Sequence, residues 1–197
     1  MRLRDDLELI SSWIKDSSRV LDLGCGDGHL LKLLKEDKNV SGYGIDNNID
    51  QIKSSINNNI SVLQLDLDDG LDGFKDNSFD YVVLAQSLQE VKKPEKLLNE
   101  MLRIGKEVII SFPNMGHWTS RFQLLFSGRM PMTRELPYSW HETPNIHLCT
   151  INDFLKFCDK NNFKVIDKSI SSYSILDNIM VNFSNNFFGS VATFRIK

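Results

Sequence analysis

Short apolar runs alternate with amphipathic stretches along most of the chain. Apolar runs bounded by polar or turn-forming residues predict buried strands at 20–23, 40–45, 60–64, 79–84, 107–112, 165–170 and 191–196. Between them, apolar residues spaced three and four apart predict helices at 7–14, 30–34, 49–56, 94–103 and 151–161. Such alternation favours an α/β fold: a doubly wound, mostly parallel seven-stranded sheet with helices on both faces.

Polar residues mark where several of these helices should begin. Short polar side chains cap helices because they accept hydrogen bonds from the free backbone N–H groups of the first turn. The predicted caps are Asp5 or Asp6 for the first helix, Asp27 for the second, and Asn152 or Thr150 for the last.

The segment 114–150 breaks the alternation. It is rich in Trp, His, Tyr, Arg, Met and Pro, and it follows the fifth predicted strand. Connections of this length inside a compact domain are usually functional lids or partly helical insertions. We therefore expect a single domain over residues 1–197, with 114–150 as a lid over the ligand crevice.

Composition limits the partners that can be expected. The 197 residues carry a net charge of −3, and their 23 lysines and arginines are dispersed, so neither nucleic acid nor an anionic membrane is favoured. The chain has no apolar run of membrane-spanning length and no secretory signal, so a cytoplasmic location is expected. Cys25, Cys149 and Cys158 are odd in number and widely spaced, which suits reduced thiols and no metal site.

The most informative motif is VLDLGCGDGH at residues 20–29. Its glycines, Gly24, Gly26 and Gly28, allow a ligand to approach the main chain closely. A dinucleotide fingerprint would need its third glycine at position 29, where His29 stands, so a nicotinamide cofactor is disfavoured. The stretch instead resembles the first motif, D-x-G-x-G-x-G, of class I methyltransferases that use S-adenosylmethionine (SAM), with Asp22 facing the ligand.

Acidic residues follow the next two predicted strands. Asp46 ends the second strand, where a carboxylate can bind two ribose hydroxyls; beginning the turn at 46–48 is the less favoured alternative. Asp66 follows the third strand and matches the acid that accepts from the adenine amino group in these methyltransferases. Asp68 and Asp69 fit a solvated turn better. Three strand-end acids should converge on one crevice.

The resemblance to methyltransferases completes the expected cofactor site for SAM or S-adenosylhomocysteine, with no metal. The predicted cofactor-binding residues are Asp22, Gly24, Cys25, Gly26, Gly28, Asp46, Asp66, Leu67, Ala85 and Gln86.

Catalytic groups are harder to assign. His117, His141 and His147 could serve as a base in methyl transfer, but a packed or hydrogen-bonded role is the stronger alternative for each. After the fourth strand, where acceptor-binding motifs usually lie, the chain offers Gln86 and Gln89, which are neutral and cannot abstract a proton. The aromatic and arginine side chains of 114–150 could line a substrate site, anchor a partner, or pack within the lid.

Six sequence blocks, in order, narrow the resemblance to the MetW family of methionine-biosynthesis proteins. They are RLRDDLELISSWI, DLGCGDGHLL, FDYVVLAQSLQ, SFPNMGHW, GRMPMT and LPYSWHETPNIHLCTINDF, and the match as a whole runs from about residue 2 to about residue 168. The resemblance implies a class I methyltransferase fold and a role beside homoserine O-acyltransferase in methionine synthesis. Two hypotheses follow: a non-catalytic partner of that enzyme, or an active SAM-dependent methyltransferase on an unknown small acceptor.

Overall fold

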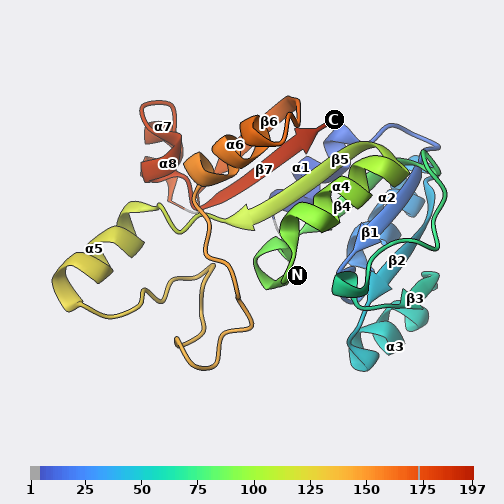
Figure 1. Cartoon of the computed structure of the whole chain (residues 1–197), viewed down its shortest axis with the longest axis horizontal. Coiled ribbons are helices and arrows are strands. Elements are labelled where there is room, and N and C mark those ends of the chain that lie inside the picture. Colours follow the sequence, from blue (N-terminus) through green and yellow to red (C-terminus); the bar gives the residue numbers. More distant parts are fainter. Residues whose placement is uncertain (1–4, 173) are drawn as a thin grey trace.

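A seven-stranded sheet organises the protein (Figure 1). The computed structural model describes residues 5–172 and 174–197. The strand order is β3-β2-β1-β4-β5-β7-β6; β1 to β5 run parallel, and β7 is antiparallel to both β5 and β6. The strands are β1 (Arg19–Leu23), β2 (Ser41–Asp46), β3 (Val62–Gln64), β4 (Phe79–Ala85), β5 (Gly105–Pro113), β6 (Val165–Ser171) and β7 (Val191–Ile196). The predicted mostly parallel sheet is confirmed.

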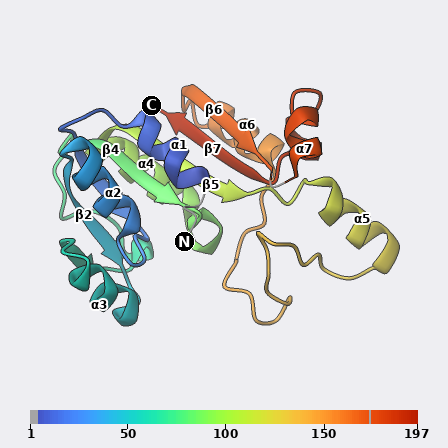
Figure 2. The ribbon, with the colours of Figure 1, turned by 180° about the vertical axis from the view of Figure 1, so that it is seen from behind.

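Helices cover both faces of the sheet, as Figures 1 and 2 show from opposite sides. Leucines and isoleucines of α1 and α2 pack on one face, whereas α4 and α6 bury Leu98, Met101 and Phe154 on the other. The helices are α1 (Asp5–Trp13), α2 (His29–Lys38), α3 (Ile49–Asn57), α4 (Pro94–Ile104), α5 (Trp118–Ser127), α6 (Ile151–Lys160), α7 (Ile175–Met180) and α8 (Asn185–Phe188). Two short 3₁₀ turns, η1 (Leu67–Asp69) and η2 (Leu88–Glu90), follow β3 and β4.

The cap predictions have mixed outcomes. Thr150 caps α6 in a reciprocal capping box with Asp153, as predicted. Asp27 accepts a hydrogen bond from the His29 backbone N–H at 3.2 Å, although Gly28 occupies the cap position itself. The prediction for Asp6 is wrong, because Asp6 lies within α1 and its buried carboxylate accepts from Ser111 Oγ at 2.9 Å. The Asp5 side chain lies outside the described residues.

The third strand begins two residues later than predicted. Ile60 is buried, but its N–H donates to the Ser55 carbonyl at the end of α3, and Asn59 before it has a left-handed φ of 59°. Ile60 therefore closes the helix and packs under the glycine turn, and strand pairing starts only at Val62.

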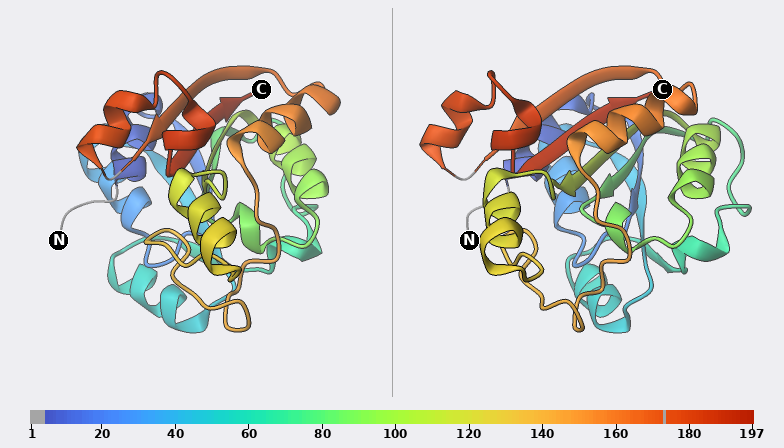
Figure 3. Two further views of the ribbon diagram at one scale, coloured as in Figure 1. Left: turned by 90° about the vertical axis from the view of Figure 1, so that its left-hand side faces the viewer. Right: turned by 60° about the vertical axis from the view of Figure 1, so that its left-hand side comes forward.

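The segment 114–150 is partly helical. It forms α5, capped by the His117 side chain, and then runs without further helix or strand to Thr150. Two short helices, α7 and α8, precede β7 and were not predicted. Both views in Figure 3 place α5 beside the α7–α8 pair, and a contact between the Phe122 and Phe187 rings at 6.5 Å joins them.

Candidate functional site

A crevice of about 290 Å³ opens at the carboxyl ends of β1, β2 and β4. Of the predicted cofactor-binding residues, four line it: Gly24, Asp46, Asp66 and Leu67. The remaining lining residues are Asn47, Leu65, Asp68, Ser87, Glu90, Val91 and Lys92. Ligands of open α/β sheets bind at this edge, so the crevice is the candidate functional site.

Asp46 holds the glycine turn against the tip of β2. Its Oδ2 accepts from the Gly26 N–H at 2.9 Å, and its Oδ1 accepts from the Asn48 N–H at 2.8 Å. The turn-forming role considered for this residue is thus present. Because each carboxylate oxygen can accept more than one hydrogen bond, the same group retains capacity for ligand hydroxyls.

The glycine turn depends on left-handed backbone angles. Gly24 and Gly26 have φ of 67° and 56°, where residues with side chains are strained. A Cβ at position 24 would lie 2.6 Å from Ser87 Oγ, so the turn packs directly on the end of β4. Gly28 does not line the crevice; a Cβ there would meet Ile60 at 3.1 Å, which makes it a packing glycine.

Asp22 and Cys25 lie beneath the crevice and are not part of its lining among the described residues. Both are buried, and Cys25 packs so closely on β2 that a Cβ at Gly44 would lie 2.4 Å from its Sγ. Burial, reinforced by the Asp22 and Asp46 charges, raises the pKa of the Cys25 thiol to about 12. At neutral pH Cys25 therefore remains protonated and is a poor nucleophile.

Ala85, the last residue of β4, and Gln86 after it are not part of the described lining of the crevice. Gln86 has a left-handed φ of 57°, its N–H donates to the Ser111 carbonyl at 2.8 Å, and its Nε2 donates to Asp6 at 3.1 Å. Gln86 thus ties β4 to β5 and α1. A strained conformation held by several contacts is typical of residues that shape a binding site.

The turns after β3 and β4 bring two unexpected acids into the crevice. Asp68 does lie in a turn, η1, as predicted, but its partly exposed carboxylate also lines the crevice and accepts from the Lys92 N–H at 2.9 Å. Asp69 is exposed, as expected. Glu90, at the end of η2, also lines the crevice; its side chain is exposed, but partial loss of hydration together with the nearby Asp46 charge raises its pKa above the usual 4.5.

Glu90 is a crevice residue that was not predicted, because the expected acceptor-binding segment after β4 ended at Gln89. The available signal was an acid in the same short connection, immediately after two amides. With it, the described lining of the crevice carries the carboxylates of Asp46, Asp66, Asp68 and Glu90 against the single ammonium of Lys92. The crevice therefore favours a cationic ligand.

The three candidate histidines lie outside this crevice. His117 is buried, its Nδ1 lies 2.7 Å from Thr119 Oγ1, and its Nε2 lies 3.5 Å from Asp177 of α7. His141 is exposed beside Ser139, and the His147 backbone N–H donates to the Gln89 carbonyl at 2.9 Å. His117 thus has a packed, helix-capping role.

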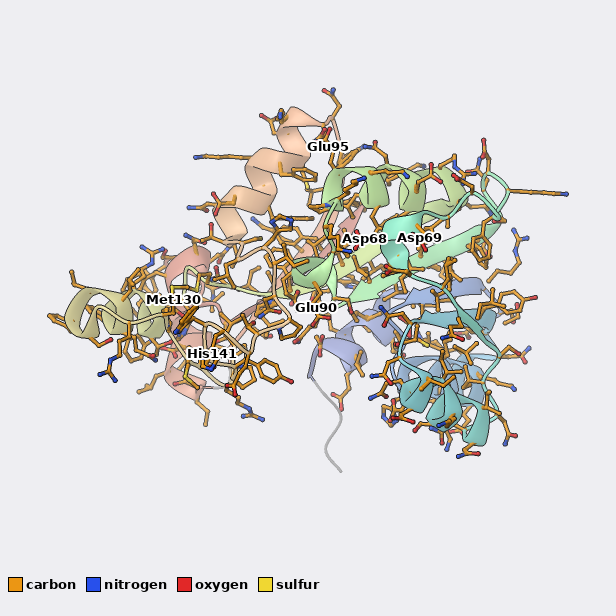
Figure 4. All side chains as sticks on the ribbon, turned by 60° about the horizontal axis from the view of Figure 1, so that its bottom comes forward. Asp68, Asp69, Glu90, Glu95, Met130 and His141 are labelled. Carbon is orange, nitrogen blue, oxygen red and sulfur yellow. The ribbon has the colours of Figure 1, made fainter. Side chains whose placement is uncertain are left out.

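The segment 114–150 does not cover the crevice. None of its residues belongs to the lining that the structure describes. Figure 4 shows Met130 and His141 of this segment to one side of Asp68 and Glu90. The expectation of a lid over the ligand is therefore not met. Helix α5 leads away from the end of β5 toward α7, and the chain then returns to the end of β4, where the Ile146 and His147 N–H groups donate to the Gln89 carbonyl.

The described residues contain neither a metal-binding cluster nor a membrane-spanning helix. Within 5–172 and 174–197, no group of three or more His, Cys, Asp or Glu residues could hold a metal ion. No helix in the same ranges has the length and apolar character needed to cross a membrane.

Solved structures with the same fold include SAM-dependent methyltransferases. One from Archaeoglobus fulgidus is 20% identical, with a TM-score of 0.66 over 97% of this chain and 94% of that one. Another from Mesorhizobium loti is 14% identical, with a TM-score of 0.69 over 96% and 95% of the two chains. At these identities the likeness establishes the class I methyltransferase fold and not the reaction.

Sequence comparison gives a narrower result. The bifunctional methionine biosynthesis protein MetXA/MetW of Rhodopirellula baltica is 37% identical over 177 residues. The match covers 85% of this chain but 28% of that protein, so this chain corresponds to a minor part of the relative. A family model described as methionine biosynthesis protein MetW matches residues 4–196. The chain therefore belongs to the MetW family of methionine biosynthesis proteins.

Proposed function

We propose that this protein is a SAM-binding, non-catalytic partner of homoserine O-acyltransferase in methionine synthesis, acting in the cytoplasm. The observation that carries the proposal is the Rhodopirellula baltica relative, in which MetXA and MetW parts share one chain. We take the MetXA part to be the acyltransferase. Fusion keeps two parts at high effective concentration, which is useful where they act together.

The lining and the charge of the crevice support SAM binding. The glycine turn leaves main chain open to a ligand, and Asp46 and Asp66 stand at the ends of adjacent strands, where a ribose and an adenine would be held. SAM carries a sulfonium and an ammonium, and the crevice is acidic. S-adenosylhomocysteine lacks the sulfonium, so weaker binding of that compound is part of the proposal. When bound, SAM would supply an activated methyl group.

The placement of titratable groups supports a non-catalytic role. The three histidines lie outside the crevice, and the high pKa of Cys25 keeps its thiol protonated. Glu90 favours the alternative, an active methyltransferase, because a carboxyl group with a raised pKa in the crevice could exchange a proton with an acceptor. A methylated product found in a substrate screen would establish that alternative.

Exposed apolar side chains at one end of the molecule offer a docking surface for the acyltransferase. We call them the α5–α7 surface: Phe122, Leu125, Phe126, Ile175, Leu176, Ile179 and Phe183. The Trp118 indole donates to Asp177 at 3.2 Å, and the Arg121 guanidinium lies 5.2 Å from the Phe187 ring centre, so α5 is held against α7 and α8. Gatherings of exposed apolar side chains are typical of interaction sites.

Enzyme turnover tests the proposed partnership. Homoserine O-acyltransferase from the same organism would be assayed alone and with this protein, with SAM titrated into both mixtures. We expect a higher rate that requires this protein, and co-elution of the two proteins at micromolar concentration. An unchanged rate in every mixture, together with separate elution, would contradict the partnership.

SAM binding should weaken as the pH falls through the raised pKa of Glu90. A cationic ligand favours the Glu90 carboxylate, so protonation of this group opposes binding at pH values where an ordinary glutamate is still ionised. Glu90→Gln should remove this part of the pH dependence. It should also raise stability slightly at neutral pH, because partial loss of hydration and the nearby Asp46 charge both disfavour the Glu90 carboxylate in the folded state.

Calorimetric titration of SAM across the acidic range measures this effect. Glu95→Gln is the matched control, because Glu95 is exposed on α4, away from the crevice (Figure 4). An unaltered pH profile in Glu90→Gln would show that Glu90 does not face the bound ligand.

A further inference from the structure

A second cavity, of about 260 Å³, lies between α4 and α6 on the opposite side of η2 from the crevice. Its walls are mainly apolar and come from five parts of the chain. The lining residues are Leu88, Gln89, Pro94, Leu98, Phe112, Pro113, His147, Cys149, Asp153, Phe154 and Phe157. Pockets for drug-sized ligands measure about 300–1,000 Å³, so this cavity suits a smaller molecule.

The turn η2 and the residue before it form a wall between the cavity and the crevice, and neighbouring residues face different sides. Leu88 and Gln89 line the α4–α6 cavity, whereas the flanking Ser87 and Glu90 line the crevice. The two spaces share no lining residue, so the cavity is a separate site. It belongs to neither the crevice nor the α5–α7 surface.

One polar group in the wall of this cavity has an unmet hydrogen-bonding capacity. Gln89 is only 9% exposed; its Nε2 donates to the Gln86 carbonyl at 2.6 Å, but its Oε1 is buried and receives no hydrogen bond from the described residues. A buried amide oxygen without a donor is costly. Because the last torsion of glutamine is broad, a small rotation could turn this oxygen toward a donor in the cavity.

The second polar group is an anion. Asp153 is exposed and lines the cavity, and its Oδ2 accepts from Thr150 Oγ1 at 2.6 Å within the α6 capping box. Gln89 Oε1 and the Asp153 carboxylate are both acceptors, and the surfaces between them are apolar. The complementary ligand therefore has an apolar body and a hydrogen-bond donor that carries positive charge.

We propose that the α4–α6 cavity is a binding site for a small apolar amine, with the ammonium held by Gln89 and Asp153 and the hydrocarbon between Leu98, Phe112 and Phe157. This site does not depend on SAM binding or on the acyltransferase. The amine site can therefore be confirmed even if the protein binds neither SAM nor the acyltransferase.

Cysteine labelling provides a local readout. Cys149 lines the cavity and is partly accessible, whereas Cys25 and Cys158 are buried. Burial raises the pKa of the Cys149 thiol to about 12, so labelling is slow and is best followed at mildly alkaline pH. The full-length protein would be treated with methyl methanethiosulfonate, which modifies thiols, and each cysteine would be followed by peptide mass spectrometry.

The probes are hexylamine and hexanoate, which share an apolar chain and differ in charge. Hexylamine should slow the labelling of Cys149 several-fold without changing that of Cys25, and hexanoate should have little effect. Gln89→Leu and Asp153→Asn should each weaken the protection by hexylamine. Gln123→Leu, on α5, is the matched glutamine control and should retain it.

Three outcomes would overturn the proposal. The first is that hexylamine does not protect Cys149. The second is that hexanoate protects Cys149 as well as hexylamine does. The third is that protection by hexylamine is unchanged in both Gln89→Leu and Asp153→Asn. The first outcome would also arise if the exposed side chains beside His147, Ile146 and Leu148, fill the cavity in solution. In that case the cavity is not a ligand site.

Discussion

Phe126→Glu is expected to weaken binding to homoserine O-acyltransferase by roughly 30-fold, which corresponds to loss of one interface hot spot. Phe126 is 79% exposed and stacks on Phe122 with ring centres 5.6 Å apart. If the α5–α7 surface docks on the enzyme, both rings lose contact with water. A glutamate there would bring an uncompensated charge into the interface.

The affinity would be measured by calorimetry, and the activation by enzyme turnover. Ile175→Glu on α7, at an 80% exposed position, should cause a similar loss. Ile56→Glu is the matched control, because Ile56 is 58% exposed on α3, far from α5 in Figure 1. All three changes should alter the free energy of unfolding by less than about 0.5 kcal/mol, since surface substitutions rarely do more.

Two results would contradict this assignment. If Ile56→Glu weakens binding and Phe126→Glu does not, the acyltransferase binds at the other end of the molecule, near α3. A homodimer that dissociates in Phe126→Glu, with enzyme binding intact, would assign the α5–α7 surface to a second copy of this chain. Analytical ultracentrifugation of the protein alone separates that case from docking on the enzyme.

The sheet and its main helices could be predicted because their apolar positions face the core with a regular period. Leu97, Leu98 and Met101 repeat at helical spacing and are all buried on the sheet. In α7 the same kind of side chain faces outward: Ile175 and Leu176 are among the most exposed apolar residues. Because the apolar side chains of this short helix point to solvent, they do not repeat at the spacing of a core-facing helix. The sequence pattern therefore did not predict α7.

The crevice was predictable only in part, for a geometric reason. Acids at strand ends converge because parallel strands end at one edge, which located Asp46 and Asp66. The positions of Asp68 and Glu90 depend instead on η1 and η2, 3₁₀ turns of three residues each, which periodicity does not predict. The direction of 114–150 depends on contacts of α5 with α7 and α8, which lie more than 45 residues further along the chain.

Asp46→Asn should reduce the affinity for SAM about ten- to hundredfold, the range for losing hydrogen bonds to a charged group. Both carboxylate oxygens accept from backbone N–H groups, those of Gly26 and Asn48. In asparagine one of these oxygens becomes an NH₂ group, so a donor would face a donor and the glycine turn would loosen. The negative charge opposite the cationic ligand would also be lost.

Calorimetric titration with SAM measures the loss, and thermal unfolding shows how much of it reflects a less stable fold. Asp69→Asn is the matched control: Asp69 lies in η1 beside the crevice, is exposed, and does not line it (Figure 4). Its affinity should equal that of the unaltered protein. If Asp46→Asn is folded and binds SAM as tightly as this control, Asp46 only closes the turn, and the ribose must be held elsewhere in the crevice.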